Sequence, residues 1–399
     1  MRLSALAEAY GTPAFILDEA DVRYRCRSYV AALPRTEIAY AGTAFLCRAM
    51  ARWIAAEGLS LAVSSAGELA VAQAVNFPAE RIILGGDART PSYLRAALRY
   101  GVDRIVVNST AEIIRLAALT PRLQRVLIQV TPGGHAHLNQ AAFGFSLRSA
   151  AAADAVRRVL SHPELTLTGL YCDLAAPLTE LSAYEAAARE LLDLMAAVRE
   201  HTGVTLTELN LGGGPGVPSA AGDDDADLAD FSDRVRRVIA SECAQLRLPF
   251  PHLVIEPGRA IVNRAMITLY RVLAVKRGAV GGTLVAVDGS MGDSPRPAPY
   301  GAGYPVHAVR PSSAPSELVT VAGRYCDAGD VLTADVTLPA DVRPGDLVAV
   351  PGAGAYNHSM APGCDLVGRP PVIAVKNGES RTLIRKETTS DLLIRDVGL

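Results

Sequence analysis

Lysine is almost absent from this chain of 399 residues, in which only Lys276, Lys376 and Lys386 occur. No residue before position 276 therefore carries a primary amine on its side chain. Arginine supplies the remaining strong positive charges, stays protonated and cannot replace lysine as a nucleophile. The N-terminal part of the chain is thus unable to form a lysine Schiff base with a bound ligand.

Long apolar runs are also lacking, since none approaches the ~20 residues needed to span a bilayer. Met1 to Ala5 have neither the apolar core nor the cleavage site of a signal peptide. A formal net charge of −2, without a basic stripe interleaved with aromatics, argues against nucleic acid as a partner. We expect a cytoplasmic protein that contacts neither membrane nor nucleic acid and binds a small polar ligand.

Metal-binding patterns are weak. The cysteines, none in C-x-x-C spacing, are Cys26, Cys47, Cys172, Cys243, Cys326 and Cys364. They predict neither a structural zinc site nor a disulfide framework. The consecutive acids Asp223 to Asp225 are not spaced as ligands, so we interpret them as a solvated loop. We expect no metal, with His135 and His137 as the open alternative for a metal or haem iron.

Short apolar segments rich in β-formers alternate with helical stretches over the first two hundred and sixty or so residues, a length typical of a barrel of roughly 250 residues. They are Ile38 to Ala41, Leu61 to Ser64, Ile82 to Gly85, Ile105 to Asn108, Val126 to Thr131, Leu167 to Cys172, Leu206 to Leu211 and Leu253 to Ile255. They lack polar and apolar alternation, as expected of strands covered on both faces. The pattern predicts an α/β fold with a (β/α)8 TIM barrel over residues 26–264.

The alternation of apolar segments with helical stretches ends after Pro257. The later apolar runs come with frequent glycine and proline and few helical stretches: Ile267 to Val275, Thr283 to Val287, Glu317 to Ala322, Leu347 to Val350 and Val372 to Val375. They predict a C-terminal β-rich domain. We assign it residues 265–399 together with residues 1–25, where Ala14 to Leu17 add a strand.

The ends of the barrel strands are where a TIM barrel carries its function. Gly212, Gly213 and Gly214 follow the seventh strand, where backbone N–H groups commonly bind phosphate; a simple tight turn is the alternative. Glu256 and Arg259 follow the eighth strand. Such a glutamate can keep a ring nitrogen protonated and such an arginine can hold a carboxylate, although the two could also pair with each other.

An ordered set of motifs extends these observations from about residue 9 to the C-terminus. They are Tyr40-Ala41 to Phe45, Ser65-Ala66-Gly67-Glu68-Leu69, Phe143-Gly144-Phe145-Ser146-Leu147, Leu211 to Gly216, Glu256 to Arg259, Asp288-Gly289-Ser290-Met291, Arg296-Pro297-Ala298-Pro299-Tyr300-Gly301, Cys326-Asp327-Ala328-Gly329-Asp330 and Gly354-Ala355-Tyr356. In this set the chain resembles the diaminopimelate decarboxylases. These are fold-type III, alanine-racemase-like enzymes that depend on pyridoxal phosphate (PLP).

The resemblance implies a homodimer with active sites shared across the interface. Gly212 to Gly214 would cradle the phosphate, Tyr356 would add a hydroxyl, and Glu256 would face the pyridine nitrogen. The residues matching substrate-binding positions are Arg259, Arg296, Tyr300 and Asp327, the last of which would receive a distal amine. The segments of Cys326 and Tyr356 would complete the partner's site. An amino-acid-type ligand with carboxylate and amine groups would suit this set.

Departures from the family pattern gather around the PLP ring. Thr43 falls where the resemblance places the Schiff-base lysine, and Ala62 where it places a strand-end aspartate. Asp173 replaces the histidine stacked on the ring, so a negative charge would lie beside an electron-rich cofactor. Ala176 and Ala142 fall at a phosphate-binding serine and at the lysine before the Phe-Gly pair. We expect no covalently bound PLP and, at most, weak binding through the glycines, Glu256 and Tyr356.

Three hypotheses about function follow. The first is an enzyme of specialised metabolism that acts on an amino acid without a PLP–lysine link. It would use Asp173 and Glu256 as acid and base at a site where Thr43 takes the lysine's place. The second is a non-catalytic regulator, or an inactive subunit in a heterodimer with an active paralogue. The third is an ordinary PLP-dependent amino-acid decarboxylase, which Thr43 argues against.

Overall fold

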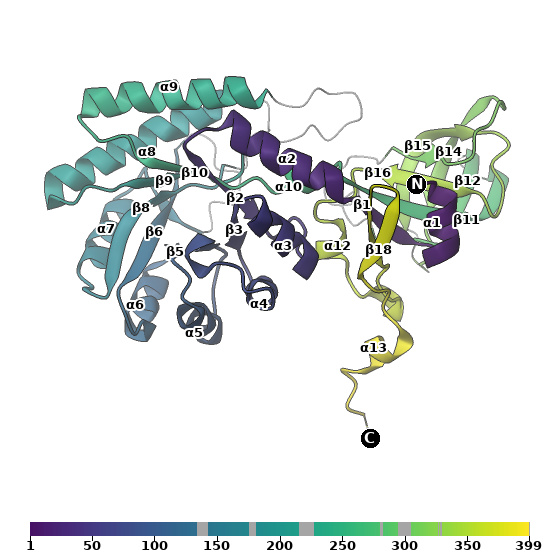
Figure 1. The fold of residues 1–399 in the computed structure, drawn as a ribbon, viewed down its shortest axis with the longest axis horizontal. Helices are drawn as coiled ribbons and strands as arrows, with labels where there is room; N and C mark the ends of the chain where they lie inside the picture. Colours follow the sequence, from purple (N-terminus) through teal and green to yellow (C-terminus); the bar gives the residue numbers. More distant parts are fainter. Residues whose placement is uncertain are drawn as a thin grey trace. The chain divides into compact units, whose positions relative to one another are not determined.

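The computed structural model describes residues 1–133, 143–174, 181–214, 227–279, 282–293, 305–325, 327 and 329–398. The chain divides into two compact units (Figure 1). We call residues Arg23–Ala260 the barrel unit, and residues Met1–Val22 with Ile261–Leu399 the β unit. Each is described by itself below.

The barrel unit contains a closed ring of parallel strands. They are β2 (Thr36–Ala41), β3 (Ser60–Val63), β4 (Ile82–Leu84), β5 (Arg104–Val107), β6 (Gln124–Thr131), β8 (Leu165–Tyr171), β9 (Glu208–Asn210) and β10 (His252–Ile255). Pairing of β10 with β2 and of β5 with β6 closes the ring, and the short β7 (Phe145–Ser146) pairs with β6. Every residue of β3, β4 and β5 is buried. The predicted TIM barrel is confirmed.

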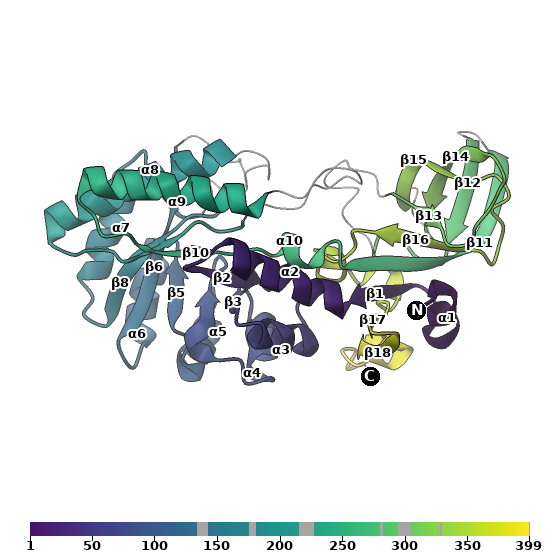
Figure 2. The same cartoon turned by 45° about the horizontal axis from the view of Figure 1, so that its top comes forward.

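Helices surround this ring (Figures 1 and 2). They are α2 (Glu19–Ala32), α3 (Arg48–Ala56), α4 (Ala66–Gln73), η1 (Ala79–Arg81), α5 (Pro91–Tyr100), α6 (Thr110–Leu119), α7 (Ala151–Leu160), α8 (Leu181–Thr202), α9 (Leu228–Leu246) and α10 (Arg259–Val262). Within the described ranges, none of the chain's helices combines the length and the apolar character that a membrane span requires.

Side chains fix where several of these helices begin. Ser65, Thr90 and Ser109 are the N-cap residues of α4, α5 and α6, and each hydroxyl accepts a hydrogen bond from a backbone N–H of the first turn. Such caps satisfy backbone donors that have no partner inside the helix. The caps hold the strand-to-helix turns that follow β3, β4 and β5 in defined conformations.

The β unit is a mixed sheet with a few short helices. Its strands are β1 (Ala14–Asp18), β11 (Met266–Ala279), β12 (Gly282–Val287), β13 (His307–Ala308), β14 (Ser316–Ala322), β15 (Val331–Pro339), β16 (Leu347–Pro351), β17 (Val372–Lys376) and β18 (Glu379–Ile384). Its helical segments are α1 (Leu3–Tyr10), α12 (Asn357–Met360), η2 (Cys364–Leu366) and α13 (Thr389–Leu393). Strand β1 lies between β11 and β17, which agrees with the expected N-terminal strand.

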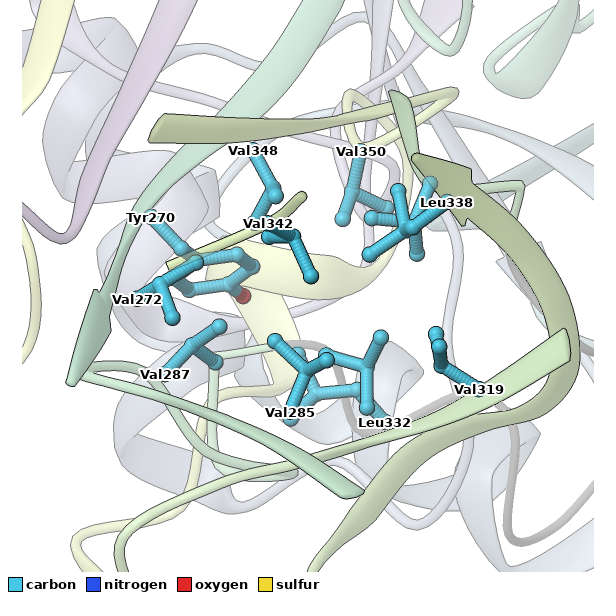
Figure 3. Packing of buried hydrophobic residues seen from close by; sticks show 12 residues of the cluster. Tyr270, Val272, Val285, Val287, Val319, Leu332, Leu338, Val342, Val348 and Val350 are labelled. Carbon is cyan, nitrogen blue, oxygen red and sulfur yellow. The ribbon is translucent and has the colours of Figure 1, made fainter. Parts of the chain in front are cut away.

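A valine-rich core holds this sheet together, as Figure 3 shows. Tyr270, Val285, Val287, Val319 and Val348 are all buried in it and come from four different strands. Burying a valine side chain contributes roughly 1.5–3 kcal/mol. Because β-branched residues also pack well on a pleated surface, this composition favours the sheet over a helix.

Candidate functional site

The parallel barrel brings the predicted site residues to one end. Thr43, Asp87, Asp173, Gly212 and Glu256 follow β2, β4, β8, β9 and β10, respectively. Since these strands run in parallel, their C-terminal ends open on the same side of the ring. The five positions therefore share the barrel mouth, at which TIM-barrel enzymes act.

The loop after β9 accepts only glycine at two positions. Gly212 has a φ of +68°, and a Cβ added there would lie 2.6 Å from the carbonyl oxygen of Cys172. A Cβ at Gly214 would lie 2.7 Å from Cγ2 of Ile255. Both distances are shorter than real side chains tolerate, so the backbone is held close to its neighbours because no side chain intervenes.

Asn210 connects this loop to Glu256. Its Nδ2 donates to Oε1 of Glu256 at 2.7 Å, and its Oδ1 accepts from the N–H of Gly212 at 2.9 Å. The N–H of Glu256 donates in turn to the carbonyl of Gly212 at 2.6 Å. Sequence reasoning missed Asn210, although a polar residue inside an apolar strand, two positions before the glycines, could have indicated it.

Glu256 titrates far from the ordinary range of a glutamate. Burial is the main cause that raises its pKa to about 7, and the charge of Asp173 acts in the same direction, while the hydrogen bond from Asn210 opposes the shift. A carboxyl group with a pKa near neutrality exchanges protons readily at physiological pH. Glu256 is therefore suited to hold or to transfer a proton at the mouth.

Asp173 adds a second perturbed acid. Although Asp173 as a residue is exposed, loss of water around its carboxyl group raises its pKa, and Asp87 raises it further. The backbone N–H of Gly213 opposes this shift by hydrogen bonding to the carboxylate. Asp87 itself accepts a hydrogen bond from Nδ2 of Asn108 at 2.5 Å. Neighbouring carboxylates disfavour each other's ionisation, so the mouth favours protons or a cationic ligand group.

Tyr171 also belongs to this acidic region. Burial raises its pKa well above the usual value, and Glu256, Asp173 and Asp87 contribute to the shift. Its neighbour Cys172 is completely buried. Burial raises the pKa of this thiol strongly, which keeps it protonated and unreactive. Tyr171 was not among the predicted site residues.

Thr43 lies exposed in the turn after β2. Two backbone hydrogen bonds fix this turn: Ala41 N–H donates to Pro257 at 3.1 Å, and Gly42 N–H donates to Ala62 at 2.9 Å. The turn is thereby attached to β3 on one side and to the segment after β10 on the other. Thr43 thus occupies the expected position at the mouth and presents a hydroxyl instead of an amine.

The other predicted residues are distributed as follows. Arg259 is half-buried, begins α10 and belongs to the barrel unit. Asp327 and Tyr356 belong to the β unit, where Asp327 Oδ1 accepts from the N–H of Gly329 at 2.7 Å and Tyr356 has a φ of +67°. Outside the described residues lie Arg296, Tyr300, Cys326, His135, His137, Ala142, Ala176, Asp223, Asp224 and Asp225.

A surface cavity of about 690 Å³ lies at the other end of the barrel, beside the start of β10. Its lining includes Arg35, Arg236, Arg237, Phe250 and His252. Because TIM-barrel chemistry occurs at the C-terminal ends of the strands, this arginine-rich cavity does not belong to the candidate site.

Comparisons with known proteins agree with the fold and with the mouth. Residues 19–263 match the family model described as "Pyridoxal-dependent decarboxylase, pyridoxal binding domain". The chain is 50% identical to the diaminopimelate decarboxylase of Actinosynnema pretiosum subsp. auranticum, over 98% of this chain and 90% of that protein. It is 41% identical to the diaminopimelate decarboxylase of Mycobacterium tuberculosis (strain H37Rv), over 99% of this chain and 93% of that protein.

A solved structure is similar over the whole chain. The diaminopimelate decarboxylase from M. jannaschii, in complex with L-lysine, has a TM-score of 0.92 and 26% sequence identity. The alignment covers 99% of this chain and 94% of that one. The similarity thus extends over both compact units.

These matches correct the expectation about the cofactor. Thr43 and Asp173 led us to expect no covalently bound PLP and weak binding at most, whereas the matched family model is a pyridoxal-binding domain over the whole barrel unit. The expectation was wrong because it gave more weight to the substitutions at Thr43 and Asp173 than to the glycine loop and Glu256. The tight glycine loop after β9 fits a phosphate, and Glu256 fits a ring nitrogen.

Proposed function

Because this chain belongs to the diaminopimelate decarboxylase family of pyridoxal-dependent decarboxylases, we propose that it is an amino-acid decarboxylase of specialised metabolism that works with Thr43 in place of the lysine. The names of the relatives and the L-lysine bound to the M. jannaschii enzyme support a substrate with a carboxylate and two amines, such as diaminopimelate or a related amino acid. The reaction releases the carboxylate as carbon dioxide and places a proton on the same carbon.

One observation carries this proposal. The glycine loop and Glu256 are joined by three hydrogen bonds of 2.6 to 2.9 Å at the ends of adjacent strands β9 and β10. The N–H group of Gly214 would bind the phosphate of PLP, and Glu256 would accept a hydrogen bond from the ring nitrogen. PLP, when bound, supplies the electron sink for the bond that breaks at the substrate carbon.

The chain's own groups have defined tasks in this proposal. Glu256 holds the proton on the ring nitrogen, and Asp173 holds a proton on its carboxyl group for delivery to the carbon that loses carbon dioxide. Arg259 binds a substrate carboxylate. Because Thr43 carries no amine, the amine of the substrate does not compete with a protein amine at this position.

We further propose that the active form is a homodimer in which Asp327 and Tyr356 of each chain complete the site of the other. Arg296, Tyr300 and Cys326 belong to the same proposed set. Size measurement by light scattering should give twice the chain mass. A single-chain mass would contradict the homodimer, and restoration of activity only after mixing with an active paralogue would favour the heterodimer.

The decisive experiment compares wild type with T43K. Purified protein is incubated with PLP and diaminopimelate, carbon dioxide release is measured, and the mixture is reduced with borohydride before peptide mass spectrometry. The proposal expects carbon dioxide release from wild type that depends on added PLP. T43K should gain a phosphopyridoxyl group on the peptide containing position 43. No release of carbon dioxide from any diamino acid tested would contradict the proposal.

A further inference from the structure

The side chain of Asn210 lies between the two parts of the mouth that would hold opposite ends of PLP. Asn210 has no exposed surface, and both polar atoms of its amide are hydrogen-bonded. One bond goes to Glu256 and the other comes from Gly212. A buried polar group with every bond satisfied usually fixes one arrangement of its neighbours.

The orientation of this amide follows from its surroundings. The N–H of Gly212 can only donate, so the atom of Asn210 that faces it at 2.9 Å must be the carbonyl oxygen. The NH₂ group then necessarily faces Oε1 of Glu256, 2.7 Å away. Oε1 is thus committed as an acceptor, and a proton on Glu256 must sit on Oε2. Among the described residues, Oε2 has no hydrogen-bond partner.

Two hydrogen bonds occupy both backbone groups of Gly212. The N–H of Gly212 is used by Asn210, and its carbonyl is used by the N–H of Glu256. The N–H of Gly213 is used by the carboxylate of Asp173, so a phosphate bound here would depend on the N–H group of Gly214. The side-chain amide of Asn210 therefore contacts both the residue that would bind the ring nitrogen of PLP and the loop that would bind its phosphate.

We infer that Asn210 is a positioning residue, which keeps Glu256 ready to receive a ring N–H through Oε2 and leaves the phosphate to Gly214. The inference rests on the proposed function, because it assigns Asn210 a task in PLP binding. Other charged groups act on Glu256 as well: Asp173 and Glu37 oppose its ionisation, and Arg104 favours it. Tyr171 of β8 lies near the same carboxyl group. None of these groups orients Oε1 by a hydrogen bond.

The test uses N210D in the full chain. Aspartate has the size of asparagine and keeps an oxygen acceptor for the N–H of Gly212, but it replaces the donor facing Glu256 by a second carboxyl oxygen. Two carboxyl groups in contact retain a shared proton to higher pH. Glu256 should then be a poorer acceptor near neutral pH, while the glycine loop keeps its conformation.

Two ligands without an aldehyde separate the ends of the site. Pyridoxine 5′-phosphate carries both a ring nitrogen and a phosphate, whereas benzyl phosphate carries only the phosphate. At pH 7, N210D should bind pyridoxine 5′-phosphate about tenfold more weakly than wild type, and the pH at which binding is half-maximal should rise. Binding of benzyl phosphate should change less than about twofold. An equal loss for both ligands, or no loss for either, would overturn the inference.

A ligand-free measurement keeps the inference testable if the proposed function fails. Failure of wild type to bind either ligand would contradict the proposed function alone. Urea unfolding at pH 8 is then compared for N210D in the wild-type and the E256Q backgrounds. N210D should raise the equilibrium constant for unfolding at least tenfold in the wild-type background. The increase should be much smaller in the E256Q background, because the amide that E256Q introduces can donate to the new carboxylate. Equal effects in the two backgrounds would contradict the positioning role.

Discussion

Arg89 and Glu112 form a buried, two-bonded ion pair beneath the turn that carries Asp87. Nε and Nη2 of Arg89 donate to the two carboxylate oxygens at 2.8 and 2.6 Å, and each side chain is at most 3% exposed. Arg89 also donates to the carbonyl of Leu84 at 2.9 Å, at the end of β4. The pair joins β4 to α6 and thereby fixes one side of the barrel mouth.

Removing one partner of this pair should strongly lower the free energy of unfolding. E112A leaves the Arg89 guanidinium buried without its counter-ion, so we expect a loss of about 3–5 kcal/mol in the free energy of unfolding. The matched control is D154A, which removes an exposed carboxylate paired with Arg157 and should cost below ~1 kcal/mol. Urea unfolding measures both. Similar losses of unfolding free energy in the two variants would show that burial does not determine how much an ion pair contributes to stability.

The glycine loop allows a separate test of its close packing. G212A must place a methyl group 2.6 Å from the carbonyl oxygen of Cys172 and adopt a left-handed backbone. Gly278 has nearly the same φ, +69°, but nothing lies within 4 Å of its would-be Cβ. G278A should therefore cost only the backbone term of about 1–2 kcal/mol. G212A should cost clearly more in thermal unfolding and abolish phosphate binding. Equal melting temperatures for the two variants would contradict the steric argument.

Much of the barrel could be predicted from the sequence because buried parallel strands leave a direct signal. Continuous apolar runs such as Ile82 to Leu84 read as strands without any knowledge of their partners, and the turn after each run then locates the mouth. The spacing of these runs also determines the number of strands in the ring. Thr43, Gly212 and Glu256 were found in this way, since each follows a strand directly.

The interactions across the mouth could not be predicted, because they depend on which strands are neighbours. Asn210 and Glu256 are far apart in the sequence and meet only because β9 pairs with β10. Tyr171 was passed over because its surroundings, and not its position in a motif, raise its pKa. The cofactor was misjudged for a related reason. Substitutions at Thr43 and Asp173 are visible in the sequence, whereas the hydrogen bonds that retain the rest of the site are not.

Cys172 provides a test of burial at the end of β8. The thiol is fully buried, and burial with the nearby charge of Asp173 raises its pKa, so it should remain protonated. A protonated thiol reacts slowly with alkylating reagents. We expect the Cys172 peptide to stay unmodified by iodoacetamide at pH 8 in native protein and to react fully in urea. Rapid alkylation of native protein at this residue would show that the thiol is accessible and would contradict its burial.

Glu256 should make the stability of the protein depend on pH. Burial raises its pKa to about 7 in the folded state from an ordinary value of 4.5, so the folded state binds more protons than the unfolded state between these values. Stability of wild type should therefore fall as the pH rises through this range. E256Q lacks the ionisation, so wild type should become less stable relative to E256Q by about 2–3 kcal/mol between pH 4.5 and pH 7. Above pH 7 the difference should stay constant.

D391N supplies a control of opposite sign for this measurement. Hydrogen bonds from Arg385 and Thr388 lower the pKa of Asp391, so its contribution to stability is present at neutral pH and is lost only in acid. Unfolding by urea is measured for the three proteins at several pH values. The E256Q difference should grow with rising pH, whereas the D391N difference should shrink as the pH falls below about 4. A flat E256Q difference would mean that Glu256 ionises in the folded protein as easily as in water, which would remove it as the group that holds a ring proton.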